Sequence, residues 1–147
     1  TCTSAAINRY LRKISRPLLD RIDICVEVPP IGFKDLYNTG KSERSEEIRK
    51  RVIRTQEIQK MRYCGEEFCF NSHIPSSKIF EYCKLDKKQE TYMERMYNKL
   101  NLTARTYHKI LRVARTLADM EESEQIKMRH LNEAICYRNI DKKFWEV

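Results

Sequence analysis

The chain has few of the residues that punctuate β-rich folds. Among its 147 residues are only three glycines and four prolines, too few for the many tight turns of an all-β sandwich or barrel. No apolar run approaches the roughly 20 residues that a membrane-spanning helix needs, and the N-terminus lacks the apolar stretch of a secretory signal peptide. We therefore expect a mainly helical, cytoplasmic protein with no membrane partner.

The balance of charge is basic. Lys and Arg number 29 against 21 Asp and Glu, which gives a formal net charge of +8. Hydrophobic residues make up 41% of the chain, enough for the core of one domain, or of one domain and a fragment. Six scattered cysteines lack the density of a disulfide scaffold and fit a reducing compartment. Because the chain begins with Thr1 and not Met, we interpret it as a fragment of a longer protein.

The first 40 residues mix several kinds of element. Residues 3–13 carry apolar side chains at helical spacing, and Pro17 ends this helix or opens the next turn. Residues 22–28 alternate apolar and polar side chains until Pro29 and Pro30 forbid further pairing, which predicts a strand whose partners lie upstream. Residues 31–42 resemble a linker, so a boundary is expected near residue 40.

Everything after this boundary is predicted to be helical. A helix over about 43–62 is expected to pack through its apolar residues, which are Ile48, Val52, Ile53, Ile58 and Met61. Ser76 is expected to cap a short helix to about Cys83, and Asp86 with Gln89 forms a capping box for a helix to about Asn101. A last helix is expected over about 127–138.

The strongest helical pattern begins after Thr103, which is expected to cap it. Its apolar residues recur at three-and-four spacing and predict a broad buried face. Its basic residues are expected on the opposite, exposed face, and they are Arg105, Lys109 and Arg112, with Arg115 nearby.

One motif suggests a phosphate-binding loop but does not fit one. Gly40, Lys41 and Ser42 match the end of the pattern G-x-x-x-x-G-K-[ST], in which backbone amides hold phosphates. Position 35 is Asp35 where that pattern needs glycine. We therefore interpret the serine as a helix cap.

A second motif has the residue types of a zinc site. Cys64, Cys69, His73 and, as a further candidate, Cys83 offer the thiolate and imidazole groups that zinc prefers. Their spacing is loose and contains no C-x-x-C pair, and single cysteines commonly serve as small core residues. We predict no metal site.

Basic residues on the 43–62 helix form a candidate nucleic-acid surface. Four of them could neutralise DNA phosphates, and they are Arg49, Lys50, Arg51 and Arg54. Glutamates at positions 43, 46, 47 and 57 interrupt this basic series. A solvated, salt-bridged helix face is an equally good interpretation.

Several long, ordered segments resemble one protein family. They are PLLDRIDI at 17–24, EEIRKRV at 46–52, LTARTYHKILRVARTLAD at 102–119 and HLNEAICYR at 130–138. Together they are similar to the magnesium-chelatase-like AAA+ ATPases of bacteria, the ComM/YifB group. The resemblance implies a helical lid over residues 41–147, preceded at 1–40 by a short helix and strand from the end of an α/β ATPase core.

The resemblance also implies roles for individual residues. Arg21 is similar to the arginine finger that reaches the nucleotide site of a neighbouring subunit, and Arg105 to the sensor-2 arginine of the lid. Lys109 and Arg112 are weaker candidates for phosphate or intersubunit contacts. The Walker A and B motifs would lie upstream, so this chain alone is expected to bind no cofactor and to be inactive.

By the same resemblance, the parent protein is an ATPase that uses ATP and Mg²⁺. It would form a homo-oligomeric ring, expected to be a hexamer, that remodels or translocates DNA, as in branch migration and natural transformation. One alternative is a basic helical module that binds nucleic acid or protein without any nucleotide role. Another is the motor subunit of a metal chelatase, which differs only in its client.

Overall fold

The computed structural model describes residues 13, 15–19, 21–30, 32–33, 37 and 42–145, with side chains up to Arg138. The predicted helix at 3–13 and most of the predicted linker at 31–42 lie outside the described residues. The described elements are α2 (Arg16–Leu19), α3 (Ser45–Arg62), η2 (Asn71–His73), η3 (Ser76–Lys78), α4 (Ile79–Tyr82), α5 (Lys87–Lys99), α6 (Ala104–Met120) and α7 (Met128–Trp145). This order confirms the prediction of a mainly helical chain, and none of the described helices is long and apolar enough to cross a membrane.

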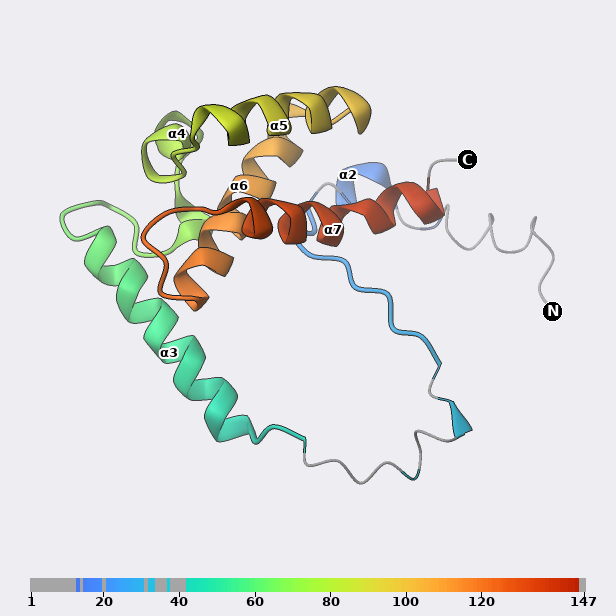
Figure 1. Cartoon of the computed structure of the whole chain (residues 1–147), viewed down its shortest axis with the longest axis horizontal. Helices are drawn as coiled ribbons and strands as arrows, with labels where there is room; N and C mark the ends of the chain where they lie inside the picture. Colours follow the sequence, from blue (N-terminus) through green and yellow to red (C-terminus); the bar gives the residue numbers. More distant parts are fainter. Residues whose placement is uncertain are drawn as a thin grey trace.

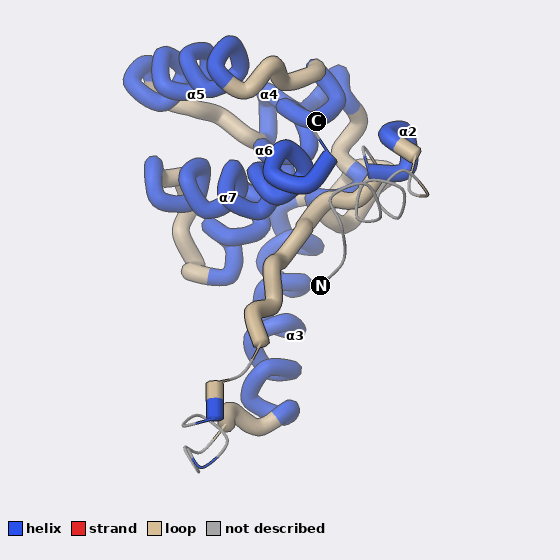
Figure 2. The backbone as a smooth tube through the Cα atoms, turned by 90° about the vertical axis from the view of Figure 1, so that its right-hand side faces the viewer, coloured by secondary structure: helices blue, strands red, loops and turns tan. Residues whose placement is uncertain are grey.

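Helix α6 is the element against which the others pack. It contacts α3, η2, α4 and, most extensively, α7. Figure 1 shows α5 across the top of the group and α3 leading away from it. In the view turned by 90°, α3 forms an arm whose first turns project beyond the other helices (Figure 2).

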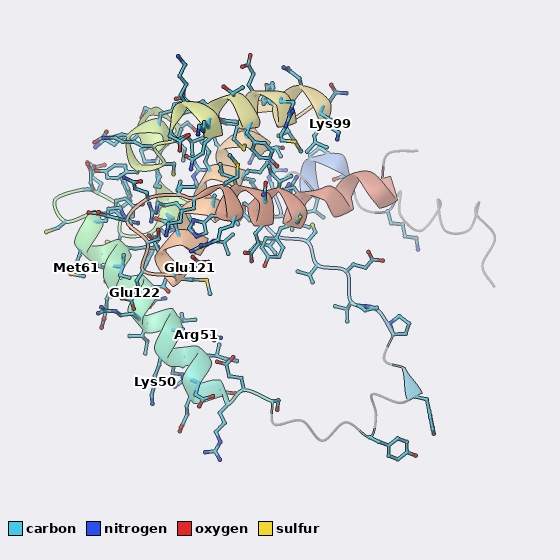
Figure 3. All side chains as sticks on the ribbon, in the orientation of Figure 1. Lys50, Arg51, Met61, Lys99, Glu121 and Glu122 are labelled. Carbon is cyan, nitrogen blue, oxygen red and sulfur yellow. The ribbon has the colours of Figure 1, made fainter. Side chains whose placement is uncertain are left out.

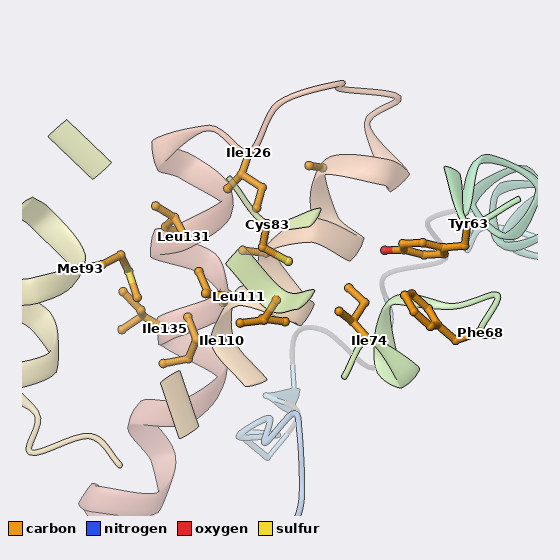
Figure 4. Packing of buried hydrophobic residues seen from close by; sticks show 14 residues of the cluster. Tyr63, Phe68, Ile74, Cys83, Met93, Ile110, Leu111, Ile126, Leu131 and Ile135 are labelled. Atoms are coloured by element: carbon orange, nitrogen blue, oxygen red, sulfur yellow. The ribbon is translucent and has the colours of Figure 1, made fainter. Parts of the chain in front are cut away.

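The hydrophobic core lies on the broad apolar face predicted for α6. Ile110, Leu111, Ala114 and Ala118 are almost fully buried there, and they pack in one cluster with side chains from α4, α5 and α7 (Figure 4). The partners from those elements include Ile79, Met93, Leu131, Ala134 and Ile135. The three-and-four spacing of the sequence therefore identified this face correctly.

Two predicted helix starts are confirmed by their capping bonds. The Asp86 side chain accepts a hydrogen bond from the Gln89 amide at 2.9 Å, and the Gln89 side chain accepts one from the Asp86 amide at 2.9 Å. The Thr103 hydroxyl accepts from the Thr106 amide at 3.2 Å. These caps satisfy amides that have no partner within the helix.

Two other predicted caps are wrong. Helix α3 has Arg44 at its N-cap, and the Arg44 amide donates to the Glu47 carboxylate at 3.3 Å, so Ser42 does not cap it. Ser76 does not cap its helix either, because it is the first residue of η3, whose N-cap is Pro75.

The strand predicted at 22–28 is not formed. Residues 22–28 are irregular, and the described part of the chain contains no strand with which they could pair. A strand alone cannot satisfy its backbone groups. The segment instead lies against α7, where the Cys25 amide donates to the Tyr137 carbonyl at 3.0 Å and the Arg138 guanidinium donates to the Ile22 carbonyl.

The predicted apolar contacts of α3 are also wrong. Ile48, Val52, Ile53 and Met61 are between 44% and 67% exposed, and Ile58 is half-buried. The buried residues of α3 are instead the polar Thr55 and Gln59. The reason is that α3 is attached through its C-terminal half and largely by polar groups, so its apolar side chains have no core to enter.

The Asp119 carboxylate forms the centre of this polar attachment. Asp119 is 1% exposed and accepts hydrogen bonds from Arg62 of α3 at 2.8 Å, from Asn71 of η2 at 2.8 Å and from Arg115 of α6 at 3.0 Å. Arg115 also donates to the carbonyls of Ser123 and Glu124, beyond the end of α6. One carboxylate thus joins α3, η2, α6 and the loop toward α7.

Replacing Asp119 with Asn should strongly destabilise the fold, because the substitution leaves Arg62 and Arg115 buried beside a neutral group. Breaking a buried ion pair in this way costs about 3–5 kcal/mol, which urea unfolding followed by far-UV circular dichroism will measure. Glu57→Gln is the matched control, since its carboxylate meets Arg54 only in an exposed pair at 3.9 Å, worth less than about 1 kcal/mol. Equal unfolding midpoints for Asp119→Asn and wild type would contradict this assignment.

Candidate nucleotide-contact site

Arg21 lies on a short, defined turn. Helix α2 ends at Leu19, and the Arg21 amide donates to the Leu18 carbonyl at 2.9 Å. The Arg21 side chain is exposed, and its Nη1 donates to the Pro17 carbonyl at 3.1 Å. This bond holds one terminal nitrogen of the guanidinium, and the other nitrogens of this exposed group stay accessible.

The residues that follow Arg21 are held against α6 and α7. The Lys109 Nζ of α6 forms an ion pair with the Asp23 carboxylate at 2.8 Å. The Cys25 and Ile22 backbone bonds to α7 lie on either side of Asp23. We call this set of three contacts the clamp. It connects the segment that carries Arg21 to two helices that are remote in sequence.

Arg105 lies one helical turn before Lys109, in the first turn of α6. Its side chain is exposed and forms no hydrogen bond or ion pair with the residues that the structure describes. The first turn of α6 contains no acidic residue. The positive end of the helix dipole and a free guanidinium therefore coincide, an arrangement that favours an anion such as a phosphate.

The other predicted basic residues of α6 do not lie on an exposed face. Lys109 is 8% exposed and Arg115 is 3% exposed, because each has a carboxylate partner in Asp23 or Asp119 that permits its burial. Arg112 is half-buried and donates to the Ile74 carbonyl at 2.7 Å. Among the four, only Arg105 is exposed.

The candidate DNA-binding residues lie on α3, on the arm that projects from the group (Figure 3). Arg51 forms an ion pair with Glu43 at 2.8 Å, and Arg54 pairs with Glu122 at 3.3 Å. Arg49 and Lys50 are exposed and have no ion pair within the described part of the chain. The solvated, salt-bridged interpretation thus suits Arg51 and Arg54, while Arg49 and Lys50 stay accessible to phosphates.

The candidate zinc ligands do not form a cluster. Among the described residues, no three His, Cys, Asp or Glu side chains converge as metal ligands. Cys83 belongs to the core, where burial raises the pKa of its thiol to about 12 and keeps it protonated. His130 on α7 is 1% exposed, and its Nδ1 accepts from the Lys127 amide at 3.0 Å.

Sequence reasoning missed Asp23 as a residue of this site. Asp23 lies two residues after Arg21, but local spacing cannot indicate a partner 86 positions later, since 109 − 23 = 86. The only available signal was an acidic residue placed among apolar ones in the segment 22–28. Such a residue is equally compatible with a solvated strand face.

Comparison with known proteins then places the chain in a family. A family model described as "Magnesium chelatase, subunit ChlI C-terminal" matches residues 42–138. The chain belongs to this family. A second model, "Magnesium chelatase, subunit ChlI", matches residues 1–36 of the ChlI-like chain.

Individual relatives support this assignment over most of the chain. It is 42% identical over 133 residues to the Competence protein ComM of Haemophilus influenzae, covering 90% of the chain and 25% of the relative. It is 36% identical over 143 residues to the uncharacterized protein YifB of Salmonella typhimurium, covering 96% of the chain and 27% of the relative. The ChlI-like chain therefore spans about a quarter of the length of these curated relatives.

The clamp can be tested by amide hydrogen exchange. Lys109→Met keeps the aliphatic stem and removes the charge, so the Cys25 amide should exchange about two- to fivefold faster, the factor that roughly 0.5–1 kcal/mol corresponds to. Two-dimensional NMR of the 147-residue chain follows this amide. Lys60→Met, which removes an exposed lysine of α3, is the control. Unchanged Cys25 exchange in Lys109→Met would show that the ion pair does not hold the segment.

Proposed function

We propose that the chain is the C-terminal part of a ring-forming ATPase. In this proposal Arg21 is the arginine finger, which acts at the nucleotide site of a neighbouring subunit, and Arg105 is the sensor-2 arginine. The observation that carries the proposal is the clamp. It connects the segment that follows the exposed Arg21 to α6, the helix that contains Arg105. Family membership supports it independently.

The described residues fit the phosphates of ATP and not its metal. Arg21 and Arg105 both present exposed guanidinium groups, whose planar, permanently charged donors suit phosphate oxygens. No three acidic or histidine side chains converge among the described residues, so the ligands of Mg²⁺ are expected in other parts of the protein. When bound, ATP with Mg²⁺ supplies the phosphoryl group that is transferred to water.

In this mechanism each arginine has a separate task. Arg21 stabilises the negative charge that develops on the phosphate oxygens in the transition state. Arg105, with the positive end of α6, holds the phosphates and thereby ties the position of α6 to the nucleotide. Lys109 is a positioning residue. Its ammonium group is paired with Asp23, so it positions the segment of Arg21 and does not contact phosphate itself.

The first test is ATP turnover by the intact parent protein. Arg21→Ala should lower kcat by about 10³- to 10⁵-fold, the usual contribution of an arginine finger, while the Kd for ATP stays within a few fold because the residue acts across the interface. Arg95→Ala, which removes an exposed arginine of α5, should leave both constants unchanged. Unaltered kcat in Arg21→Ala would overturn the finger assignment.

A mixing experiment decides whether Arg21 acts across the interface. Arg21→Ala subunits are combined with subunits whose Walker A lysine has been replaced, so that neither kind hydrolyses ATP alone. Turnover should reappear in mixed rings, because a Walker A variant still offers its Arg21 to a neighbour. A mixture with no more activity than its components would place Arg21 at its own subunit's nucleotide site.

DNA is the client that we propose for the motor. The net charge of +8 favours a polyanion, and a relative named as a competence protein supports the same choice. Arg49 and Lys50 are exposed on the arm formed by α3, where neither has an ion-pair partner among the described residues. These two residues are the proposed phosphate contacts, with Arg51 and Arg54 already engaged by glutamates.

The salt dependence of DNA binding tests this surface. Replacing Arg49 and Lys50 together by Ser should reduce the slope of log K against log[salt] by up to about 1.8, since each lost duplex phosphate contact removes about 0.9. Fluorescence anisotropy with a labelled duplex provides the measurement, and Lys99→Ser on α5 is the control (Figure 3). An unchanged slope in the double variant would exclude α3 as the DNA surface.

The exposed basic residues of the same arm also favour the alternative, a module that binds nucleic acid or protein without a nucleotide role. In that case substitution of Arg49 and Lys50 would abolish function, whereas Arg21 and Arg105 would be dispensable. A metal-chelatase motor would retain the effect of Arg21→Ala on ATP turnover and show no stimulation by DNA. Turnover assays with and without single-stranded and branched DNA therefore separate the three proposals.

A further inference from the structure

A hollow of about 340 Å³ is lined by residues of α4, α5 and the beginning of α6. Four aromatic rings and two carboxylates line it, and these belong to Phe80, Tyr97, Tyr107, His108, Glu90 and Glu94. We call this feature the aromatic hollow. Its volume is at the lower end of the range for ligand sites, so it has room for a side chain of a partner.

The rings form a continuous wall. The ring centroids of Phe80 and His108 lie 5.7 Å apart, those of Phe80 and Tyr107 6.4 Å apart, and those of Tyr107 and Tyr97 5.9 Å apart. Phe80 is 61% exposed although it is one of the largest apolar side chains in the chain. A surface of this kind leaves aromatic faces, which carry partial negative charge, open to a partner.

The two carboxylates add full negative charge to the rim. Glu90 and Glu94 are exposed, lie four residues apart on α5, and have no ion-pair partner within the described part of the chain. Like charges at this spacing weaken a helix. The pair is unusual in a chain with eight more basic than acidic residues, because nearby lysines and arginines could have neutralised it.

No charged group on the wall itself repels a cation. Burial, and then the neighbouring Arg112, lowers the pKa of His108, so its ring is neutral at pH 7. Burial, and then Glu90, raises the pKa of Tyr107, so its phenol stays protonated. The α5 side of the hollow therefore carries the negative charge of Glu90 and Glu94, and the ring faces add partial negative charge, while Arg105 is the chain neighbour of the lining residue Ala104 on the α6 side.

We propose that the aromatic hollow binds an arginine side chain of a protein partner. A guanidinium can stack on an aromatic face and donate paired hydrogen bonds to a carboxylate at the same time, which a compact ammonium group cannot do. The proposal rests on the rings and on Glu90 and Glu94, and not on roles of Arg21 or Arg105, so it stands whether or not the proposed ATPase function holds.

NMR titration of the 147-residue chain with two matched tripeptides tests the proposal. Acetyl-Gly-Arg-Gly-amide should shift the amides of residues 90–97 and 104–108 in a saturable way, with a Kd on the order of millimolar, and acetyl-Gly-Gln-Gly-amide should not. A Lys tripeptide should bind about two- to fivefold more weakly. Equal binding of the Gln or Lys peptide, or no saturable shift, would overturn the assignment of an arginine site.

Variants connect the binding to the named side chains. Glu90→Gln with Glu94→Gln, and separately Tyr97→Leu, should each weaken the Arg peptide about two- to fivefold or more, whereas Glu57→Gln on α3 should have no effect. An amide spectrum that is unchanged outside the hollow shows that each variant has kept the fold. Unchanged affinity in both variants would overturn the proposal, as would concentration-dependent shifts at these amides without peptide, which would identify a second copy of this chain as the occupant.

Discussion

The buried carboxylate of Asp119 is the interaction on which the arrangement of helices depends. Arg62 and Arg115 approach it from α3 and α6, and Asn71 completes its hydrogen bonds from η2. A charge at this depth is tolerated only when its oxygens are fully used. Since the partners come from three elements, the angle between α3 and α6 is set by hydrogen-bond geometry and not by apolar packing alone.

This polar attachment has a consequence for the surface of α3. Helix α3 reaches the core through Gln59 and Arg62 at its C-terminal end, and its turns before Arg54 form no hydrogen bond or ion pair with another helix within the described part of the chain. The apolar Val52 is consequently exposed on the same helix as the basic Lys50, which Figure 3 labels. An arm of this composition offers phosphate contacts and hydrophobic area on one element, which a helix packed along its full length could not do.

Prediction from the sequence was correct for some local interactions and wrong for others of the same range, such as the caps expected at Ser42 and Ser76. The caps at Asp86 and Thr103 involve neighbours three residues away and were predicted correctly. The strand at 22–28 and the exposure of Lys109 depend on partners elsewhere in the chain, and these predictions were wrong. The exposure predicted for Arg115 was also wrong, although its partner Asp119 lies only four residues later. The roles proposed for Arg21 and Arg105 came from family resemblance, since an exposed arginine alone is compatible with any surface.

The clamp explains how two such arginines can act as one unit. An ion pair with a carboxylate as exposed as that of Asp23 is worth less than about 1 kcal/mol, too little to fix a segment alone. The backbone bonds of Ile22 and Cys25 to α7 supply the remaining restraint. Helices α6 and α7 share one apolar core and therefore move together. In the ring that we propose, a displacement of α6 at its first turn would carry the segment of Arg21 with it, so a change at one proposed nucleotide site would reach the next through packed helices.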